Sequence, residues 1–259
     1  MVDSNKIERY DFNDLLALME QLRGEGGCPW DREQTHQSIR RNFIEEVYEA
    51  CEAIDNEDNT HLCEELGDVL LQVVFHAHIA QSDGAFDMTD VTDGICRKLI
   101  LRHPHIFGEV SVSGSAEVLD NWEEIKRREK QQETYTQAMD EVAKSLPALI
   151  YAEKMQKRAR KAGFDWDDVS GALDKVREET DELASAIKGE GNAEEELGDL
   201  LFAAVNVARF LEVDPEEALR KAARKFHRRF ARVEEMAGDA LKGMSLAEMD
   251  KLWDKAKLI

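Results

Sequence analysis

Apolar side chains recur at steps of three and four residues in two well-separated segments of the chain. The first stripe consists of Leu62, Leu66, Val69, Leu70, Val73, Val74 and Ala77, and the second of Leu197, Leu200, Leu201, Ala204, Val205 and Ala208. This spacing is typical of helices with one buried face. Polar turns at 58–60 and 189–192 come before the stripes, and helical patterns over 35–54 and 170–187 come before the turns. Each segment therefore predicts two antiparallel helices joined by a short turn, an αα-hairpin with a buried stripe.

Further helical patterns follow each hairpin. They cover 89–102 and 116–133 in the first half of the chain, and 215–236 and 245–257 in the second half. The chain has only four prolines, and alternating β-branched and aromatic residues are scarce, so strands are hard to place. The pattern predicts an all-α fold made of two tandem helical-bundle modules.

A polar stretch that ends at Ser145-Leu146-Pro147 separates the two sets of helices. Such a stretch is typical of a boundary between domains. We expect a first module over residues 1–134, a linker over 135–147 and a second module over 148–259.

The composition limits the binding partners and the cellular location that we expect for this protein. The formal net charge is −21 and the isoelectric point about 4.8, so we expect neither nucleic acid nor an anionic membrane as a partner. No apolar run approaches the roughly 20 residues that span a bilayer, and residues 1–10 lack the apolar core of a signal peptide. The four cysteines form no C-x-x-C pair, which favours reduced thiols and a cytoplasmic protein.

Acidic pairs at helical spacing occupy corresponding places in the two halves. The first set is Glu46, Glu49, Glu65 and Asp68, and the second is Glu179, Glu182, Glu196 and Asp199. Residues three apart share a helix face, so each pair directs two carboxylates the same way. Two such helices side by side bring four carboxylates together, which requires a cation. Because the ligands are all oxygen, the sequence predicts a site for Mg²⁺, with Mn²⁺ as a substitute, in each half.

Cations and aromatic residues follow the acidic hairpins at repeated spacings. The pairs are Lys98/Arg102 and Trp122/Lys126 in the first half, and Lys225/Arg229 and Trp253/Lys257 in the second. A single cationic pair usually belongs to a solvated helix face, and a single tryptophan to packing. Their repetition favours a role in binding phosphate through Lys and Arg, and a base through the indole. Aromatic loops at 28–31 and 163–166 either close over a base or cap the bundle.

The two halves differ on the side where a substrate would bind. Lys175 lies four residues before Glu179 and shares its helix face, whereas Asn42 occupies the matching place before Glu46. The second half therefore has the more complete set of residues for a polyphosphate–metal complex. We expect it to be the active half.

Each stripe helix also contains a glycine, Gly67 or Gly198. A glycine inside a helix costs about 1 kcal/mol relative to alanine. One interpretation is that it leaves room for a neighbouring backbone or a group bound to the metal. The other is that a small residue is tolerated where two helices cross.

These motifs together resemble the MazG family of nucleoside triphosphate pyrophosphohydrolases. The likeness covers residues 12–257 and is closest in three short motifs and the two acidic hairpins. The motifs are Gly27-Cys28-Pro29-Trp30-Asp31, Arg102-His103-Pro104-His105-Ile106-Phe107 and Gly163-Phe164-Asp165-Trp166. The resemblance implies tandem MazG modules of the all-α type and a homodimer. It also implies Mg²⁺-dependent cleavage of NTPs and dNTPs to monophosphate and pyrophosphate, with loose base preference, in nucleotide-pool housekeeping or stress control.

The resemblance assigns the activity to the C-terminal module. The catalytic metal ligands implied there are Glu179, Glu182, Glu196 and Asp199, and the residues implied to hold nucleotide are Lys175, Lys225, Arg229, Trp253 and Lys257. The first module matches the acidic motif but departs from the pattern at Asn42, which predicts weak or absent catalysis there.

Two other interpretations fit parts of the pattern. Di-iron bundles also use carboxylates on paired helices, but they need a Glu-x-x-His pair on two helices. Here Glu33 and His36 have that spacing alone, and the second hairpin contains no histidine. The other alternative is a non-catalytic helical regulator that binds nucleotides or a protein. Two matched acidic hairpins, each followed by its own cations, favour the enzyme.

Overall fold

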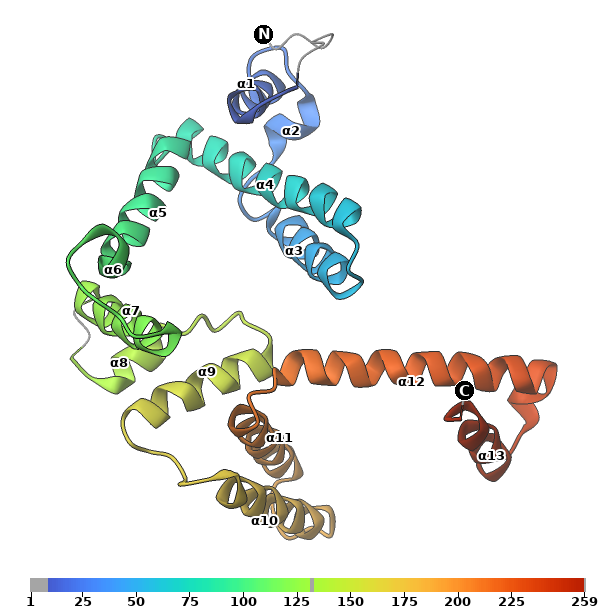
Figure 1. Cartoon of the computed structure of the whole chain (residues 1–259). Coiled ribbons are helices and arrows are strands. Elements are labelled where there is room, and N and C mark those ends of the chain that lie inside the picture. The colour runs from blue at the N-terminus through green and yellow to red at the C-terminus, as the bar shows by residue number, and fades with distance from the viewer. Residues whose placement is uncertain (1–8, 131–132, 259) are drawn as a thin grey trace. The chain divides into compact units, whose positions relative to one another are not determined.

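All the regular structure of the described residues is helical (Figure 1). The computed structural model describes residues 9–130 and 133–258. The helices are α1 (Phe12–Arg23), α2 (Pro29–Glu33), α3 (Arg40–Asp55), α4 (Asn59–Ser82), α5 (Met88–Arg102), α6 (Pro104–Phe107), α7 (Ser115–Glu129), α8 (Tyr135–Asp140), α9 (Ala148–Lys161), α10 (Val169–Ile187), α11 (Ala193–Phe210), α12 (Pro215–Ala237), the 3₁₀ helix η1 (Gly238–Gly243) and α13 (Leu246–Ala256). The predicted all-α fold is confirmed. Contacts divide the chain into two units, Met1–Lys126 and Arg127–Ile259.

In the first unit, α3 and α4 form the expected hairpin, and α1 packs on α4. Helix α4 begins at Asn59 because the Asp58 carboxylate accepts hydrogen bonds from the first free backbone N–H groups. A buried cluster of Met19, Ile39, Val74, Phe75 and Ile79 holds α1 to the C-terminal half of α4. The N-terminal half of α4, which carries the acidic motif, is left to pair with α3.

In the second unit, α10 and α11 form the second hairpin, and α9 packs on α11. The cap of α10 is Asp168 and that of α11 is Asn192, each of which accepts from a backbone N–H of the first turn. Helix α12 starts at Pro215 and leads away from this hairpin, with α13 packed near its far end (Figure 1). The acidic hairpin and the α12–α13 arm therefore occupy different parts of the same unit.

Two expected helices differ at their ends. Helix α3 begins at Arg40, not at residue 35, because residues 34–39 form a turn in which the Thr35 N–H donates to Ser38 Oγ at 2.9 Å. That hydroxyl in turn donates to Gln34 Oε1 at 2.8 Å. The helix expected over 116–133 runs from Ser115 to Glu129, and residues 131–132 lie outside the described part of the chain.

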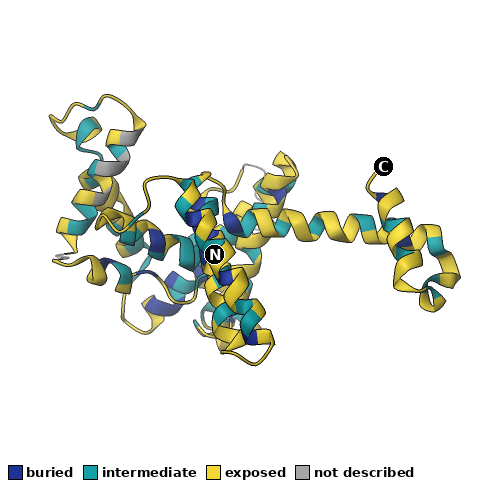
Figure 2. Ribbon diagram, turned by 90° about the horizontal axis from the view of Figure 1, so that it is seen from below, coloured by how far each residue is buried: buried dark blue, intermediate teal, exposed yellow. Residues whose placement is uncertain are grey.

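The apolar stripes are only partly buried, and exposed positions make up much of the ribbon (Figure 2). Val74, Ala77 and Val205 are buried, but Leu66 is 55% exposed and Leu201 49% exposed. Leu70 and Leu197 are also exposed, and so is Ala204. The prediction that the whole stripe is buried is therefore wrong for the parts nearest the acidic motifs, because no other helix of the described chain covers them. Among the described residues, no helix is long and apolar enough to cross a membrane.

Candidate metal centre

The C-terminal hairpin brings three of its four motif carboxylates into one cluster. Glu179 on α10 and Glu196 and Asp199 on α11 each place one oxygen within 4.8 Å of the others. Glu179 is only 4% exposed, while Glu196 is half-buried and Asp199 exposed. The cluster is therefore open on one side, as a site that exchanges a ligand must be.

One oxygen of Glu179 is unsatisfied. Its Oε1 lies 2.6 Å from Lys175 Nζ, but its buried Oε2 has no hydrogen-bond partner among the described residues. A buried carboxylate oxygen without a partner costs free energy, because it has lost its water. A divalent cation held by oxygen ligands removes this cost, so the donor set fits Mg²⁺ or Mn²⁺.

Glu182 lies beside this cluster and not within the group of three. Desolvation raises the pKa of its carboxyl above the ordinary value, and the negative charge of Glu179 raises it further. The charge of Glu196 acts in the same direction, and Lys175 opposes it. Glu182 thus lies close enough to Glu179 and Glu196 to be affected by their charges.

Lys175 is held by two carboxylates. Its ammonium group lies 2.8 Å from Glu178 and 2.6 Å from Glu179, and these hydrogen bonds raise the pKa of Lys175. The lysine therefore stays charged at the edge of the acidic cluster. This is the position from which a cation can contact a phosphate group bound to a metal.

The N-terminal hairpin carries a similar cluster with a different arrangement. Glu46, Glu49 and Glu65 each place one oxygen within 4.8 Å of the others. Here the buried member is Glu65, on the second helix of the hairpin, and its Oε2 has no partner among the described residues. Asp68 lies outside the group of three, but after desolvation its charge is the next cause that raises the pKa of Glu46.

A histidine supports the first cluster in a way that the spacing analysis missed. His61 Nε2 lies 2.9 Å from Glu65 Oε1, and its charge partly offsets the desolvation that raises the pKa of Glu65. The signal was present in the sequence, because residues four apart on a helix face each other. Asn192 takes the matching place in the second hairpin, four residues before Glu196, and caps α11. The buried glutamate of the first cluster thus pairs with His61 on its own helix, whereas that of the second cluster pairs with Lys175.

The remaining residues expected to bind substrate lie on the α12–α13 arm. Lys225 and Arg229 are near the middle of α12, and Trp253 packs on Phe226 of α12 with ring centroids 5.1 Å apart. Lys257 follows α13 and pairs with Asp254 at 2.8 Å. Because the arm leads away from the hairpin, the folded chain does not bring these four residues to the acidic cluster (Figure 1). Of the expected substrate-binding set, only Lys175 lies at the cluster.

The helical glycines are open in the structure. A Cβ atom added at Gly67 or Gly198 would meet no atom of the described chain within 4 Å. The expectation of a close neighbouring backbone is therefore not met within one chain, and neither glycine lies at a tight helix crossing.

Comparison with known proteins gives a consistent result. The model of the MazG nucleotide pyrophosphohydrolase domain matches residues 34–107 and again 168–233. A nucleoside triphosphate pyrophosphohydrolase/pyrophosphatase MazG from Thermotoga maritima is 47% identical over 249 residues, which is 95% of each chain. A nucleoside triphosphate pyrophosphohydrolase from Escherichia coli K12 is 45% identical over 98% of this chain and 97% of the relative. The uncharacterized protein YabN from Bacillus subtilis is 49% identical over 99% of this chain and 53% of its own length.

Proposed function

The chain belongs to the MazG nucleotide pyrophosphohydrolase family, and on that premise we propose that it hydrolyses nucleoside triphosphates to nucleoside monophosphate and pyrophosphate. The proposal places the reaction at the cluster of the second unit. Glu179, Glu182, Glu196 and Asp199 would hold Mg²⁺ there, with Mn²⁺ as a substitute.

The observation that supports a metal here is the unsatisfied Oε2 of Glu179, and Lys175 at the edge of the cluster favours the second unit over the first. The unsatisfied oxygen is buried inside a group of three carboxylates whose oxygens already converge. When bound, Mg²⁺ would neutralise charge on the triphosphate and lower the pKa of the attacking water. Oxygen ligands alone suit that role, and the described cluster offers no sulfur or imidazole ligand that would favour another metal.

The chain's own residues would position the substrate and receive the proton. Water attacks the α-phosphorus, the bond from that phosphorus to the bridging oxygen of the leaving group breaks, and pyrophosphate departs. One glutamate of the cluster accepts the proton of the water, because a carboxylate within reach of the water serves as general base. Lys175, now bound to Glu178 and Glu179, donates to a phosphate oxygen when the substrate arrives.

The cations of the α12–α13 arm would reach the cluster from a second copy of the chain. Lys225 and Arg229 carry the charge that a triphosphate needs beyond Lys175, yet they lie away from the acidic hairpin of their own chain. Exposed apolar side chains on another face of α11, such as Leu197 and Leu201, offer a surface on which another copy can pack. We therefore propose a homodimer in which Lys225, Arg229, Trp253 and Lys257 complete the partner's site.

The finer features of the reaction are also part of the proposal. We expect both NTPs and dNTPs to be cleaved with little preference for the base, because an indole stacks on any base. Such an activity suits nucleotide-pool housekeeping or stress control. The alternative, a regulator that binds nucleotides without cleaving them, requires the same cluster but no proton acceptor.

The test uses matched variants in the full chain. Glu179→Gln should lower pyrophosphate release at least about 100-fold, since even the groups that support a metal ligand are each worth 10- to 100-fold. Glu46→Gln makes the same change in the first unit and should leave the rate nearly unchanged. Products from NTPs and dNTPs with Mg²⁺ would be separated by anion exchange. If wild-type protein binds nucleotide but releases no pyrophosphate, the regulator is correct and the enzyme is not.

A further inference from the structure

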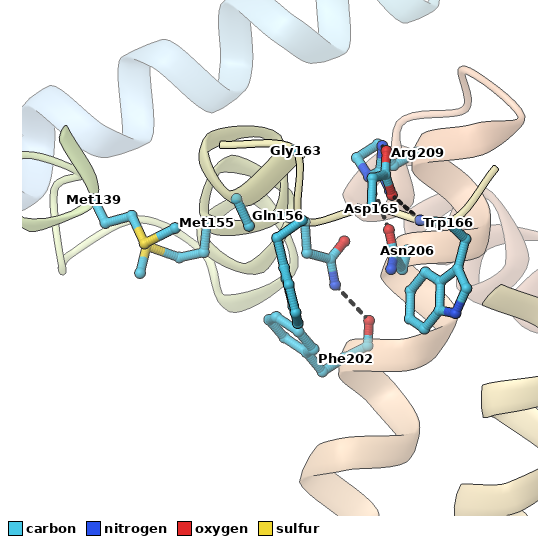
Figure 3. A pocket seen from close by; sticks show the side chains of 11 residues that line it. Met139, Met155, Gln156, Gly163, Asp165, Trp166, Phe202, Asn206 and Arg209 are labelled. Atoms are coloured by element: carbon cyan, nitrogen blue, oxygen red, sulfur yellow. Dashed lines mark hydrogen bonds and ion pairs between the residues drawn. The ribbon is translucent and has the colours of Figure 1, made fainter. Parts of the chain in front are cut away.

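The second unit contains a cavity of about 460 Å³ (Figure 3), and no residue of the acidic cluster lines it. It lies between α9, the loop that follows it and the C-terminal half of α11, and one methionine from α8 completes its wall. The lining residues are Met139, Met155, Gln156, Ala159, Gly163, Phe164, Asp165, Trp166, Phe202, Asn206 and Arg209. Ligand pockets in proteins are commonly about 300–1,000 Å³, so this cavity can hold a small organic molecule.

Three aromatic rings and two methionines form much of the apolar wall of the cavity. Phe202 comes from α11, and Phe164 and Trp166 come from the loop between α9 and α10. Phe164 is 83% exposed, so its large apolar surface is left in water in the folded chain. Aromatic rings arranged around a cavity favour flat, unsaturated ligands, which stack on their faces.

The floor of the cavity has a fixed hydrogen-bond acceptor. Gln156 is 6% exposed, and its Nε2 donates to the backbone oxygen of Phe202 at 2.7 Å (Figure 3). This bond fixes the orientation of the amide, so Oε1 remains as the acceptor. That oxygen is buried and has no partner among the described residues. A ligand N–H that donates to this oxygen supplies the missing hydrogen bond, which favours binding.

A donor accompanies this acceptor. Asn206 is buried on α11, and its Oδ1 accepts from Arg209 Nε at 2.8 Å. The amide therefore offers its NH₂ group to a ligand. Gln156 and Asn206 together present one acceptor and one donor at the same end of the cavity.

The cavity carries almost no net charge. Arg209 donates to both oxygens of Asp165, at 2.9 and 2.5 Å, so the two charges of the lining neutralise each other. The guanidinium is nearly fully buried by this pair and by its contact with Phe210, 4.4 Å from the ring centroid. A phosphate group needs a free cation or several N–H donors, which this lining does not present. The cavity is thus suited to an uncharged ligand.

We propose that this cavity binds an uncharged, planar nitrogen heterocycle of the nucleobase class. The ring lies against Trp166 and Phe202, one of its N–H groups donates to Gln156 Oε1, and a neighbouring acceptor receives the Asn206 NH₂. Every nucleobase has a donor and an acceptor side by side on its pairing edge, so the site distinguishes bases only weakly. Phe164 covers the ring from the solvent side.

The heterocycle has two sources, a free nucleoside and the base of the nucleotide bound at the metal. Asp199, Phe202, Asn206 and Arg209 recur at steps of three and four on α11, so the metal ligand and the cavity share one helix face. Seven residues separate Asp199 from Asn206, about 10 Å along the axis. The second source rests on the proposed function, and the first does not.

The experiment is titration calorimetry on the full chain with adenosine and cytidine, and with ribose as a ligand that lacks the base. Both nucleosides should bind and ribose should not. Gln156→Leu should weaken binding about tenfold, the value of a hydrogen bond to a buried acceptor. Phe164→Ala should weaken it to a similar extent through lost stacking. Because Phe164 is exposed, Phe164→Ala should keep the fold even if Gln156→Leu lowers the melting temperature. Lys157→Gln, one residue from Gln156 and outside the cavity, is the matched control.

A second titration identifies the source. In the presence of Mg²⁺ and a saturating non-hydrolysable triphosphate, a cavity filled by the substrate's own base no longer binds adenosine, whereas a separate nucleoside site binds it unchanged. Ribose binding equal to adenosine binding, or equal adenosine affinity in wild type, Gln156→Leu and Phe164→Ala, would overturn the proposal. Pyrophosphate release and its dependence on Glu179 are measured in parallel, so failure of the cavity is distinct from failure of the proposed function.

Discussion

Single residues distinguish the two acidic clusters. The carboxylates of both hairpins converge, but only the second has a lysine, Lys175, bound to the cluster. Asn42 takes its place in the first hairpin and cannot supply a charge. One difference between the units is therefore a lysine at the edge of the acidic cluster, present in the second unit and replaced by asparagine in the first.

Replacing Lys175 by the residue of the first unit tests this difference. Lys175→Asn should raise the KM for nucleoside triphosphate about tenfold or more, since a hydrogen bond to a charged group contributes about 1.5–3 kcal/mol. The value of kcat should change less if the lysine mainly binds the substrate. Steady-state kinetics of pyrophosphate release give both constants. Arg177→Asn, on the same helix with its guanidinium bound to Asp174, is the control, and an equal rise in KM there would show a non-specific loss of charge.

The carboxylates also predict an unusual pH dependence of stability without metal. The pKa values of Glu46, Glu65 and Glu182 are raised above the ordinary value of 4.5, in each case first by desolvation. The stability that these groups contribute is present below 4.5 and is lost as pH rises through the raised pKa values. In EDTA, the melting temperature should therefore fall as pH rises above that value, and Mg²⁺ should restore it near neutral pH.

Calorimetric melting across this pH range, with EDTA and with Mg²⁺, measures the effect. The double variant Glu46→Gln/Glu182→Gln should show a flatter dependence on pH, because neither side chain titrates. Metal affinity should fall as pH is lowered through the same range, since protons compete with the cation for the carboxylates. If Mg²⁺ did not change the melting temperature of the wild-type protein at any pH, the proposal that the cluster binds a cation would be wrong.

At the residue scale, the sequence predicted a cluster of four carboxylates in each unit, and three of each four lie together in the structure. The i,i+3 spacing on paired helices brings the two helix faces together but did not show that Glu182 and Asp68 lie outside the groups. It did not show that Glu65 is the buried member in one unit and Glu179 in the other. That difference depends on how each hairpin packs, which a repeat in the sequence does not encode.

At the scale of helices, local signals were strong because polar caps mark the starts. Asp58, Asp168 and Asn192 each satisfy backbone N–H groups at the first turn of a hairpin helix. The start of α3 was placed too early because the turn at 34–39 is made by side-chain hydrogen bonds of Ser and Thr. Such bonds compete with a helix without changing the apolar period.

The open glycines give a prediction at this scale. Gly198→Ala should stabilise the chain by up to about 1 kcal/mol, because alanine favours the helix and the structure leaves its Cβ free of contacts. The melting temperature should rise, and pyrophosphate release should be unchanged. Gly67→Ala should behave in the same way in the first unit. A rise in stability with loss of activity would indicate that a bound group or a second chain approaches the backbone of α11 at this point.

At the scale of the whole molecule, the apolar pattern predicted where the helices lie better than it predicted which surfaces pack on their apolar faces. The period of three and four residues shows that one face of a helix is apolar. It does not show whether that face packs on another helix of the same chain or on a second chain. Leu66 and Leu201 lie in the predicted stripes and are about half exposed. The separation of Lys225 and Arg229 from the cluster has the same origin, because the direction of α12 after the hairpin depends on packing and not on period.

A homodimer would account for both features and predicts a defined mass in solution. Light scattering should give about twice 29.5 kDa for the wild-type chain. Leu201→Glu places a charge on the exposed apolar face of α11. Desolvation of that charge on association is unfavourable, so the variant should be monomeric and should release pyrophosphate more slowly. Val110→Glu makes the same change in a loop of the first unit, at a residue that is also exposed and lies outside both the second hairpin and the α12–α13 arm, and should leave the mass unchanged. A wild-type monomer with full activity would show that Lys225 and Arg229 act within one chain, after a movement of α12, and would remove the argument for a partner.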